Sequence, residues 1–221
     1  MGFWRVIQTK GAYFLSTLAG GVPETLLVAS FAIFFALFFG LAIALLRMSR
    51  WTLLRIPAVA FVELFRGTPA LVQLFVIYFG LPDVGYDPSP LQAAIVGLGL
   101  NGAAYLSEIY RAGIESIHLG QMEAALSLGM TPVHAMQYIV LPQAIQSMLP
   151  PITNFAIVMV KDTALVFAVG VVEIMALARQ LVTETLQSAV IYLLVGCIYL
   201  CITIPMARIA IRLELSKQVW H

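Results

Sequence analysis

Charged side chains are scarce in this chain. Of its 221 residues only 10% are Asp, Glu, Lys or Arg, whereas 61% are hydrophobic, which is too apolar for a water-soluble protein of ordinary composition. The formal net charge is only +1, and there is no acidic or basic tract of the kind that binds nucleic acid or another polyanion. These shortages indicate an integral membrane protein that lies in a lipid bilayer and has no nucleic-acid partner.

Candidates for redox chemistry, metal binding or phosphate binding are also few. The two cysteines, Cys197 and Cys201, lie four residues apart in an apolar run, where packing on one helix face explains them without redox chemistry. His118 and His134 lack the spacing and the cysteine partners of a zinc site. The sequence also lacks the glycine-rich phosphate-binding loop of ATPases. We therefore expect no catalytic residue, no metal site and no cofactor bound by this chain.

Long stretches without charge predict an all-α integral membrane protein with about five transmembrane helices. A helix needs about 20 residues to cross the hydrocarbon core of a bilayer. The expected spans cover approximately residues 20–46, 57–81, 88–111, 141–168 and 185–208. The first of them is as long as a full span and lacks the layout of a cleavable signal peptide, so we expect it to be retained. A single transmembrane domain, residues 1–221, accounts for the chain.

Basic residues predict the orientation of these spans, because cytoplasmic loops carry an excess of Lys and Arg. They follow the first span, open the segment after the third span and mark the tail: Arg47, Arg50, Arg55, Arg111, Arg208, Arg212 and Lys217. The opposite side has the acidic, proline-rich loop 81–90. We therefore expect the N-terminus outside and the C-terminus in the cytoplasm.

The one sizeable polar insert, residues 116–140, predicts a cytoplasmic segment of two short helices joined by a turn. Gly129 can end the first helix, while Thr131 and Pro132 supply an N-cap and a proline at the first position of the second helix. The Leu-Pro pair at 141–142 predicts a bend before the next span. On composition alone, amphipathic helices lying on the membrane explain this insert equally well.

The spacing within the insert resembles the EAA motif of the membrane permease subunits of ABC importers. The motif is matched at Glu123, Ala124, Ala125, Gly129, Ile139, Leu141 and Pro142. Residues 63–82, 103–130, 141–154 and 161–165 resemble the polar amino acid branch of that family, which includes glutamine, histidine and arginine permeases. Two departures are Ala164, where many relatives have serine, and the tail after Leu215.

This resemblance implies ATP-driven import by alternating access. In that family the EAA segment docks on a cytoplasmic ATPase, which assigns coupling here to Glu123, Ala124, Ala125, Gly129, Thr131 and Pro132. The implied partners are a second, identical or similar permease subunit, two ATPase subunits that bind ATP and Mg, and an extracytoplasmic solute-binding protein. The implied substrate is a polar amino acid, and the implied location is the inner (plasma) membrane of a bacterial cell.

Polar residues inside the apolar runs are candidates for the substrate path. A charged side chain costs about 2.5–3.5 kcal/mol at the centre of a membrane helix, so the adjacent Lys161 and Asp162 need partners or water. The prolines at 150–151 are expected to interrupt their helix and leave Asn154 near a cavity. The expected path residues are Lys161, Asp162, Thr163, Asn154, Asn101 and Gln73.

Structural roles for the same residues stay open. Lys161 and Asp162 can bond to neighbouring helices instead of substrate, and Asn101 lies among small residues that favour close helix packing. The same run of small residues predicts that the third span packs tightly against its neighbours. Gln73 in the second span has the same two interpretations as Asn101.

Two pairs of opposite charge have the three-residue spacing of helical ion pairs. They are Glu63 with Arg66 and Glu108 with Arg111, and we expect both to anchor helices at the cytoplasmic side. The outer segment also carries charges, Glu173 among them. These charges either meet a delivery protein or face water, and we expect them to face water.

Other function classes explain less of the sequence. An ion-gradient-driven small-solute carrier or channel subunit uses Lys161 and Asp162 but gives residues 116–140 no role. An intramembrane enzyme built on Asp162 lacks a second catalytic group, and an accessory membrane scaffold carries no solute. The docking segment therefore favours an importer subunit.

Overall fold

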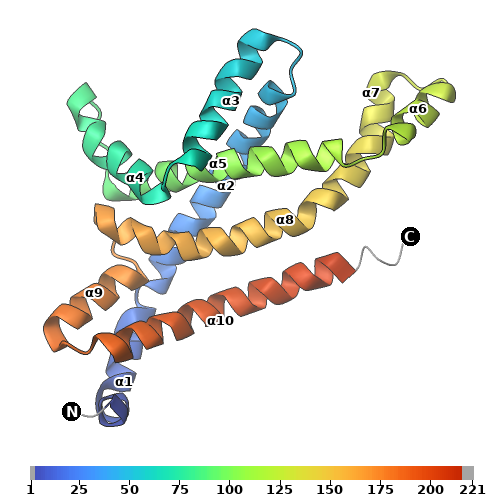
Figure 1. Cartoon of the computed structure of the whole chain (residues 1–221). Coiled ribbons are helices and arrows are strands. Elements are labelled where there is room, and N and C mark those ends of the chain that lie inside the picture. Colours follow the sequence, from blue (N-terminus) through green and yellow to red (C-terminus); the bar gives the residue numbers. More distant parts are fainter. Residues whose placement is uncertain (1–2, 216–221) are drawn as a thin grey trace.

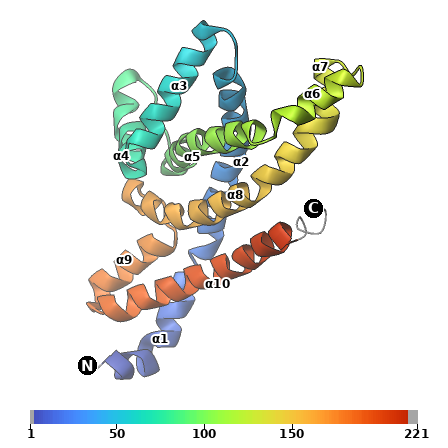
Figure 2. The same cartoon turned by 45° about the vertical axis from the view of Figure 1, so that its right-hand side comes forward.

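A computed structural model of the protein describes residues 3–215, with the burial of side chains described as far as Arg212. The regular elements of this part of the chain are all helical, which confirms the expected all-α fold class. Lys217, the last of the basic residues used for the orientation, lies outside the described residues. Figures 1 and 2 show that the helices cross one another in a branched arrangement.

The elements follow one another along the chain, with short π-helical and 3-10 turns marked η. They are α1 (Phe3–Ala19), α2 (Val22–Arg47), α3 (Thr52–Gly67), α4 (Ala70–Phe75), η1 (Val76–Gly80), η2 (Pro82–Val84), α5 (Pro90–Glu115), α6 (Leu119–Ser127), α7 (Pro132–Ala135), η3 (Met136–Val140), α8 (Leu141–Asp162), η4 (Thr163–Val169), α9 (Ile174–Thr185) and α10 (Ser188–Leu215).

Three helical segments of the described chain are long and apolar enough to cross a membrane. They are Phe3–Arg47, Pro132–Val169 and Ser188–Arg212, and the bent pair of α3 with the segment from α4 to η2 adds a fourth candidate. The 26-residue helix α5 is long enough to cross a membrane but is less apolar and is outside this set. The count of about five spans therefore stays a prediction.

The expected second span, 57–81, is not one straight helix. The chain turns by 109° between α3 and the segment that begins with α4. Thr68, at the break, has extended backbone angles (φ −121°, ψ 147°) and precedes Pro69, and a residue before proline is driven out of the helical region by clash with the ring. The sequence Gly67-Thr68-Pro69 thus ends one helix and starts another.

Helix α8, unlike the run from α3 to α4, continues without a break at its prolines. Residues Pro132–Val169 form one continuous helical segment, with the π-helical η3 directly before Leu141, so the helix does not break at 141–142 and the bend predicted there stays a prediction. The predicted interruption at 150–151 is wrong, because both prolines lie inside α8. Pro142 is the second residue of α8 and follows directly on the π-helical turns of η3. Packing of α8 on α5 and α10 holds the helix together around the other two prolines.

Helices α2 and α5 share the most extensive contact in the structure, and small residues make it close. A Cβ atom added to Gly40 would lie 2.9 Å from the Cβ of Leu106 and 3.0 Å from the carbonyl oxygen of Ala103. On α5 itself, Gly97, Ala103 and Ala104 are buried. The prediction that small residues pack the third span tightly is therefore confirmed.

Helices α1, α9 and α10 have a core of their own, which lies at the lower end of the molecule in Figure 1. Val6, Phe14 and Leu18 of α1 are buried there against residues of α9 and α10. The expectation that Glu173 faces water is wrong, because this side chain is 0% exposed. Its carboxylate caps α9 by accepting hydrogen bonds from the backbone N–H groups of Met175 (2.8 Å) and Ala176 (2.9 Å).

The buried carboxylate of Glu173 ties α9 to its neighbours. Tyr199 of α10 donates a hydrogen bond to it over 3.3 Å, and Thr25 of α2 accepts one from the next backbone N–H, that of Ile174, over 3.4 Å. Burial raises the pKa of Glu173 above its ordinary value, against the effect of these hydrogen bonds. An acidic N-cap stabilises a helix by about 0.5–2 kcal/mol, which explains why an acid occupies this buried position.

Candidate functional site

The segment from α6 to α7 is built by two local signals. Gly129 has φ +82°, a left-handed conformation in which glycine carries no Cβ penalty. The N–H of Gly129 bonds to the carbonyl of Leu126 (2.9 Å), and the N–H of Met130 bonds to that of Ala125 (3.2 Å), which closes the end of α6. Thr131 then starts α7 by accepting a hydrogen bond from the N–H of His134 over 3.3 Å.

This segment projects away from α1 and α9 in both views of the molecule (Figures 1 and 2). Of its EAA residues only Ala125 is buried, at 3% exposed, while Glu123 and Ala124 face outward. Large apolar side chains are also exposed here, with Leu128 at 84%: Leu119, Leu126, Leu128, Val133 and Tyr138. An exposed apolar patch on a polar segment marks a surface that binds another macromolecule or a membrane.

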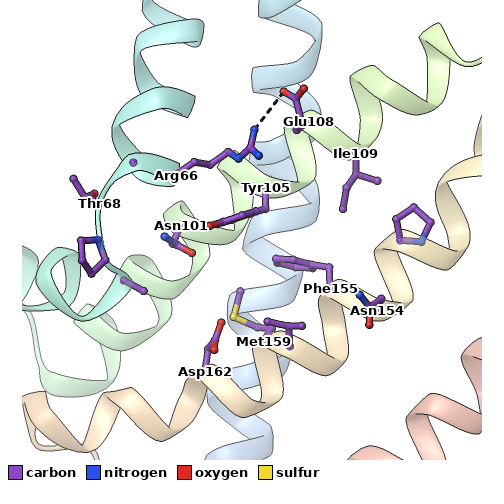
Figure 3. A pocket seen from close by; sticks show the side chains of 15 residues that line it. Arg66, Thr68, Asn101, Tyr105, Glu108, Ile109, Asn154, Phe155, Met159 and Asp162 are labelled. Carbon is purple, nitrogen blue, oxygen red and sulfur yellow. Dashed lines mark ion pairs between the residues drawn. The ribbon is translucent and has the colours of Figure 1, made fainter.

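A cavity of about 740 Å³ lies between the break after α3, helix α5 and helix α8 (Figure 3). Three of the residues predicted for the substrate path line it: Asn101, Asn154 and Asp162. The other three do not line this cavity. Gln73 is buried behind it, Thr163 is fully buried and donates its hydroxyl to the carbonyl of Val160 (2.7 Å), and Lys161 is exposed elsewhere.

Helical periodicity explains which residues of α8 reach the cavity. Asn154, Val158 and Asp162 follow one another at four-residue steps and lie on one face. Lys161 is one residue from Asp162 and so points about 100° away from it around the helix axis. The structure therefore separates two charges that are adjacent in the sequence.

Gln73 and Asn101 hold the break between α3 and α4 in place. The side-chain amide of Gln73 donates to the carbonyl of Phe65 (2.8 Å), and that of Asn101 donates to the same oxygen (3.0 Å). Asn101 also donates to the amide oxygen of Gln73 over 3.0 Å. The carbonyls left without partners at the end of α3 are thus satisfied from α4 and α5. Gln73 thus contacts Asn101, which lines the cavity, without lining it itself.

An ion cluster of α2, α3 and α5 surrounds Glu108, which lines the cavity. Arg47 of α2 lies 2.5 Å from Glu108, and Arg111 pairs with both Glu108 and Glu115. The predicted pair of Glu108 with Arg111 is therefore confirmed, and Arg47 joins it from another helix. Within the described chain these contacts tie α5 to α2.

The predicted pair of Glu63 with Arg66 is wrong. Arg66 lies 3.9 Å from Glu108 instead, and its guanidinium carbon is 5.3 Å from the centre of the Tyr105 ring. Figure 3 shows the side chain of Arg66 reaching from the end of α3 toward Glu108 above Tyr105. Glu63 is exposed, and it forms no ion pair within the described residues.

Sequence reasoning missed part of the cavity lining, including Arg66, Thr68, Tyr105 and Glu108. A signal was present, because Asn101, Tyr105 and Glu108 are spaced at four and then three residues and form a polar stripe on an otherwise apolar helix. Arg66 and Thr68 carried no such periodic signal. They reach the cavity only because the chain breaks at Thr68.

The chain is similar to known proteins over most of its length. Residues 12–215 match the model of the family described as "Binding-protein-dependent transport system inner membrane component". The chain belongs to this family. A relative within it, the "Probable amino-acid permease protein YxeN" of Bacillus subtilis (strain 168), is 41% identical over 191 residues, which are 85% of each protein.

Further relatives extend the similarity to whole chains and to a solved structure. The "Octopine transport system permease protein OccM" of Rhizobium radiobacter is 38% identical over 206 residues, which cover 89% of this chain and 84% of that protein. The structure described as "Crystal structure of an amino acid ABC transporter with histidines" superposes with a TM-score of 0.87 at 33% identity and covers 99% of this chain and 98% of the other. The fold of this inner membrane component is therefore the permease fold.

Proposed function

We propose that this chain is the membrane permease subunit of an ATP-driven importer for polar amino acids. The observation that carries this proposal is the α6–α7 segment, which exposes Leu128 at 84% beside the left-handed turn at Gly129. An ATPase that covers this apolar surface would bury it and pass its own motion to the helices behind it. Ala125 is buried, and its helix α6 packs on α7 and η3, which lead into α8.

The remaining parts of the proposal concern the assembly. A second permease subunit, identical or similar, completes the membrane part, two cytoplasmic ATPase subunits bind ATP and Mg and hydrolyse the ATP, and an extracytoplasmic binding protein delivers the amino acid. This chain supplies no catalytic residue and holds no cofactor. It lies in the bacterial inner membrane with its N-terminus outside, and it moves substrate by alternating access.

The cavity beside α8 is the proposed substrate path. A polar amino acid carries an ammonium group and a carboxylate, and a site for it needs partners for both. Asp162 provides the partner for a cation, and Asn154 offers an amide that donates or accepts hydrogen bonds. Asn101 offers its amide oxygen as an acceptor, because its NH2 group donates to Phe65 and Gln73. The names of the relatives, which refer to amino acids and to octopine, support substrates of this class.

Substitution of Gly129 by Asp tests the docking role. The left-handed angle costs a residue other than glycine about 1–2 kcal/mol, and Asp is among the residues that adopt it most readily, so we expect the subunit to fold. The new charge would lie unpaired at the ATPase contact, which is costly. We expect the amount of ATPase that co-purifies with the detergent-solubilised subunit to fall to about a tenth or less.

The matched control is Gly85→Asp, which has φ +88° and, like Gly129, nothing within 4 Å of an added Cβ, but lies in the loop 81–90. This control should retain the ATPase. Loss of ATPase from both variants would point to misfolding, and equal retention by both would refute the docking role of α6–α7. Wild-type protein that is folded yet binds no ATPase would favour the gradient-driven carrier over the importer.

A further inference from the structure

Arg66 is the third arginine near the carboxylate of Glu108, which already pairs with Arg47 and Arg111. The Oε2 atom of Glu108 lies 2.5 Å from the Nη1 atom of Arg47 but 3.9 Å from the Nη1 atom of Arg66. The Oε1 atom of Glu108 pairs with Arg111. Both carboxylate oxygens therefore have a closer cationic partner than Arg66.

The charges of this cluster do not balance. Three guanidinium groups, those of Arg47, Arg66 and Arg111, face two carboxylates, those of Glu108 and Glu115. One positive charge is left over. Arg66 carries it, because its side chain makes the longest of these contacts and is 42% exposed, the largest fraction of the three arginines.

The surplus charge is presented to the cavity. Arg66 lines the cavity, with its guanidinium carbon 5.3 Å from the centre of the Tyr105 ring. A guanidinium group held over an aromatic face keeps its N–H donors along its edge, where they match the two oxygens of a carboxylate. Figure 3 shows Arg66 and Asp162 at opposite ends of the lined space, with Asn101 and Tyr105 between them.

We propose that Arg66 binds the α-carboxylate of the transported amino acid, at the end of the cavity opposite Asp162. This assignment rests on the proposed function and adds an anion site to it. A cavity with a guanidinium group at one end and a carboxylate at the other fits a zwitterion, and it disfavours a ligand that has lost either charge. Bidentate contacts between arginine and a carboxylate supply both attraction and orientation.

The first step of the test establishes transport. The subunit is reconstituted in proteoliposomes with its ATPase and binding protein, and ATP-driven uptake of a ¹⁴C-labelled mixture of the twenty L-amino acids identifies the amino acid that is carried. Absence of uptake of every amino acid by the wild-type importer would overturn the proposed function and this assignment with it. Uptake without any role for Arg66 would overturn the assignment alone.

The second step measures binding without the binding protein, which has a selectivity of its own. The permease–ATPase complex in nanodiscs is titrated with the amino acid identified in the first step and with its α-amide, which lacks the negative charge. We expect Arg66→Gln to weaken binding of the acid by about tenfold or more, as for a charge-assisted hydrogen bond, and to leave binding of the amide within about twofold. The preference for acid over amide would then disappear.

Two further variants complete the design. Arg55→Gln removes an exposed arginine from the same helix and should leave both affinities unchanged. Arg66→Lys keeps the charge but not the planar fork, so the preference for the acid should fall severalfold without vanishing, and this variant decides the matter if Arg66→Gln does not assemble. A preference for the acid that persists unchanged in either Arg66 variant, or an equal loss of acid and amide binding, would overturn the assignment.

Discussion

Lys161 and Asp162 are adjacent in the sequence but have different surroundings. Asp162 lines the cavity between α5 and α8, whereas Lys161 is exposed outside it. The sequence predicted both as path residues because both are charges in an apolar run. The side of α8 that packs on α5 decides which of the two side chains faces the cavity.

This difference predicts unequal effects of neutralising the two charges. Asp162→Asn keeps the shape of the side chain but removes its charge, and hydrogen bonds to charged groups contribute about 1.5–3 kcal/mol. We expect the KM for ATP-driven uptake to rise about tenfold or more. Lys161→Gln should change KM by no more than about twofold, as surface substitutions do. Equal effects of the two substitutions on uptake kinetics would remove Asp162 from the path.

Other residues of the site could be predicted from the sequence to different degrees. Gly129, Thr131 and Pro132 carry local signals, and all three occupy the backbone positions that those signals require. Arg66 could not be placed, because Glu63 three residues earlier offered an equally good partner by spacing. The partner that Arg66 has in the structure, Glu108, is distant in sequence and is found only once α3 and α5 are packed.

At the scale of elements, prolines had opposite effects in two places. Pro69 ends the run of α3, whereas Pro150 and Pro151 lie inside a continuous α8. Thr68 before Pro69 adopts extended angles, and Gln73 supplies a side-chain donor for the helix end. Sequence alone reports only that a proline is present; whether a helix breaks depends on which groups replace the missing hydrogen bonds.

The break between α3 and α4 yields a stability prediction. Gln73→Leu removes the donors to Phe65 and Thr68 and the acceptor for Asn101. Because a buried polar group without its partner costs about 1–3 kcal/mol, the purified variant should unfold at a lower temperature than wild type. Gln146→Leu, an exposed position on α8, serves as the control. Matching unfolding temperatures for Gln73→Leu and wild type would show that the break needs no such support.

For the whole molecule, composition predicted an integral membrane protein, and the distribution of basic residues predicted the orientation of its helices in the membrane. The all-α fold followed from apolar runs of sufficient length. The number of spans was harder to predict, since α5 is polar enough to differ from a lipid-facing helix and α1 was not anticipated at all. Both helices depend on partners from distant parts of the chain, which no local pattern reports.

The orientation is tested by labelling single cysteines introduced after replacement of Cys197 and Cys201 by alanine. Val84→Cys, in the loop 81–90, and Leu128→Cys, in the α6–α7 segment, are both at highly exposed positions, 77% and 84%. A membrane-impermeant maleimide applied to spheroplasts should label Val84→Cys at once and Leu128→Cys only after the membrane is opened. The reverse pattern would place α6–α7 outside and would be incompatible with docking on a cytoplasmic ATPase.

The separate core of α1, α9 and α10 has a consequence for biosynthesis. The ribosome makes α1 before the residues that cover Phe14 and Leu18, which belong to α9 and α10 and begin 155 residues after α1 ends. At a synthesis rate of about 5–20 residues per second, α1 waits roughly 10–30 s for these partners. During that interval its apolar face is open to lipid or to the insertion machinery, so helices that are made later, α9 and α10, complete the packing of α1.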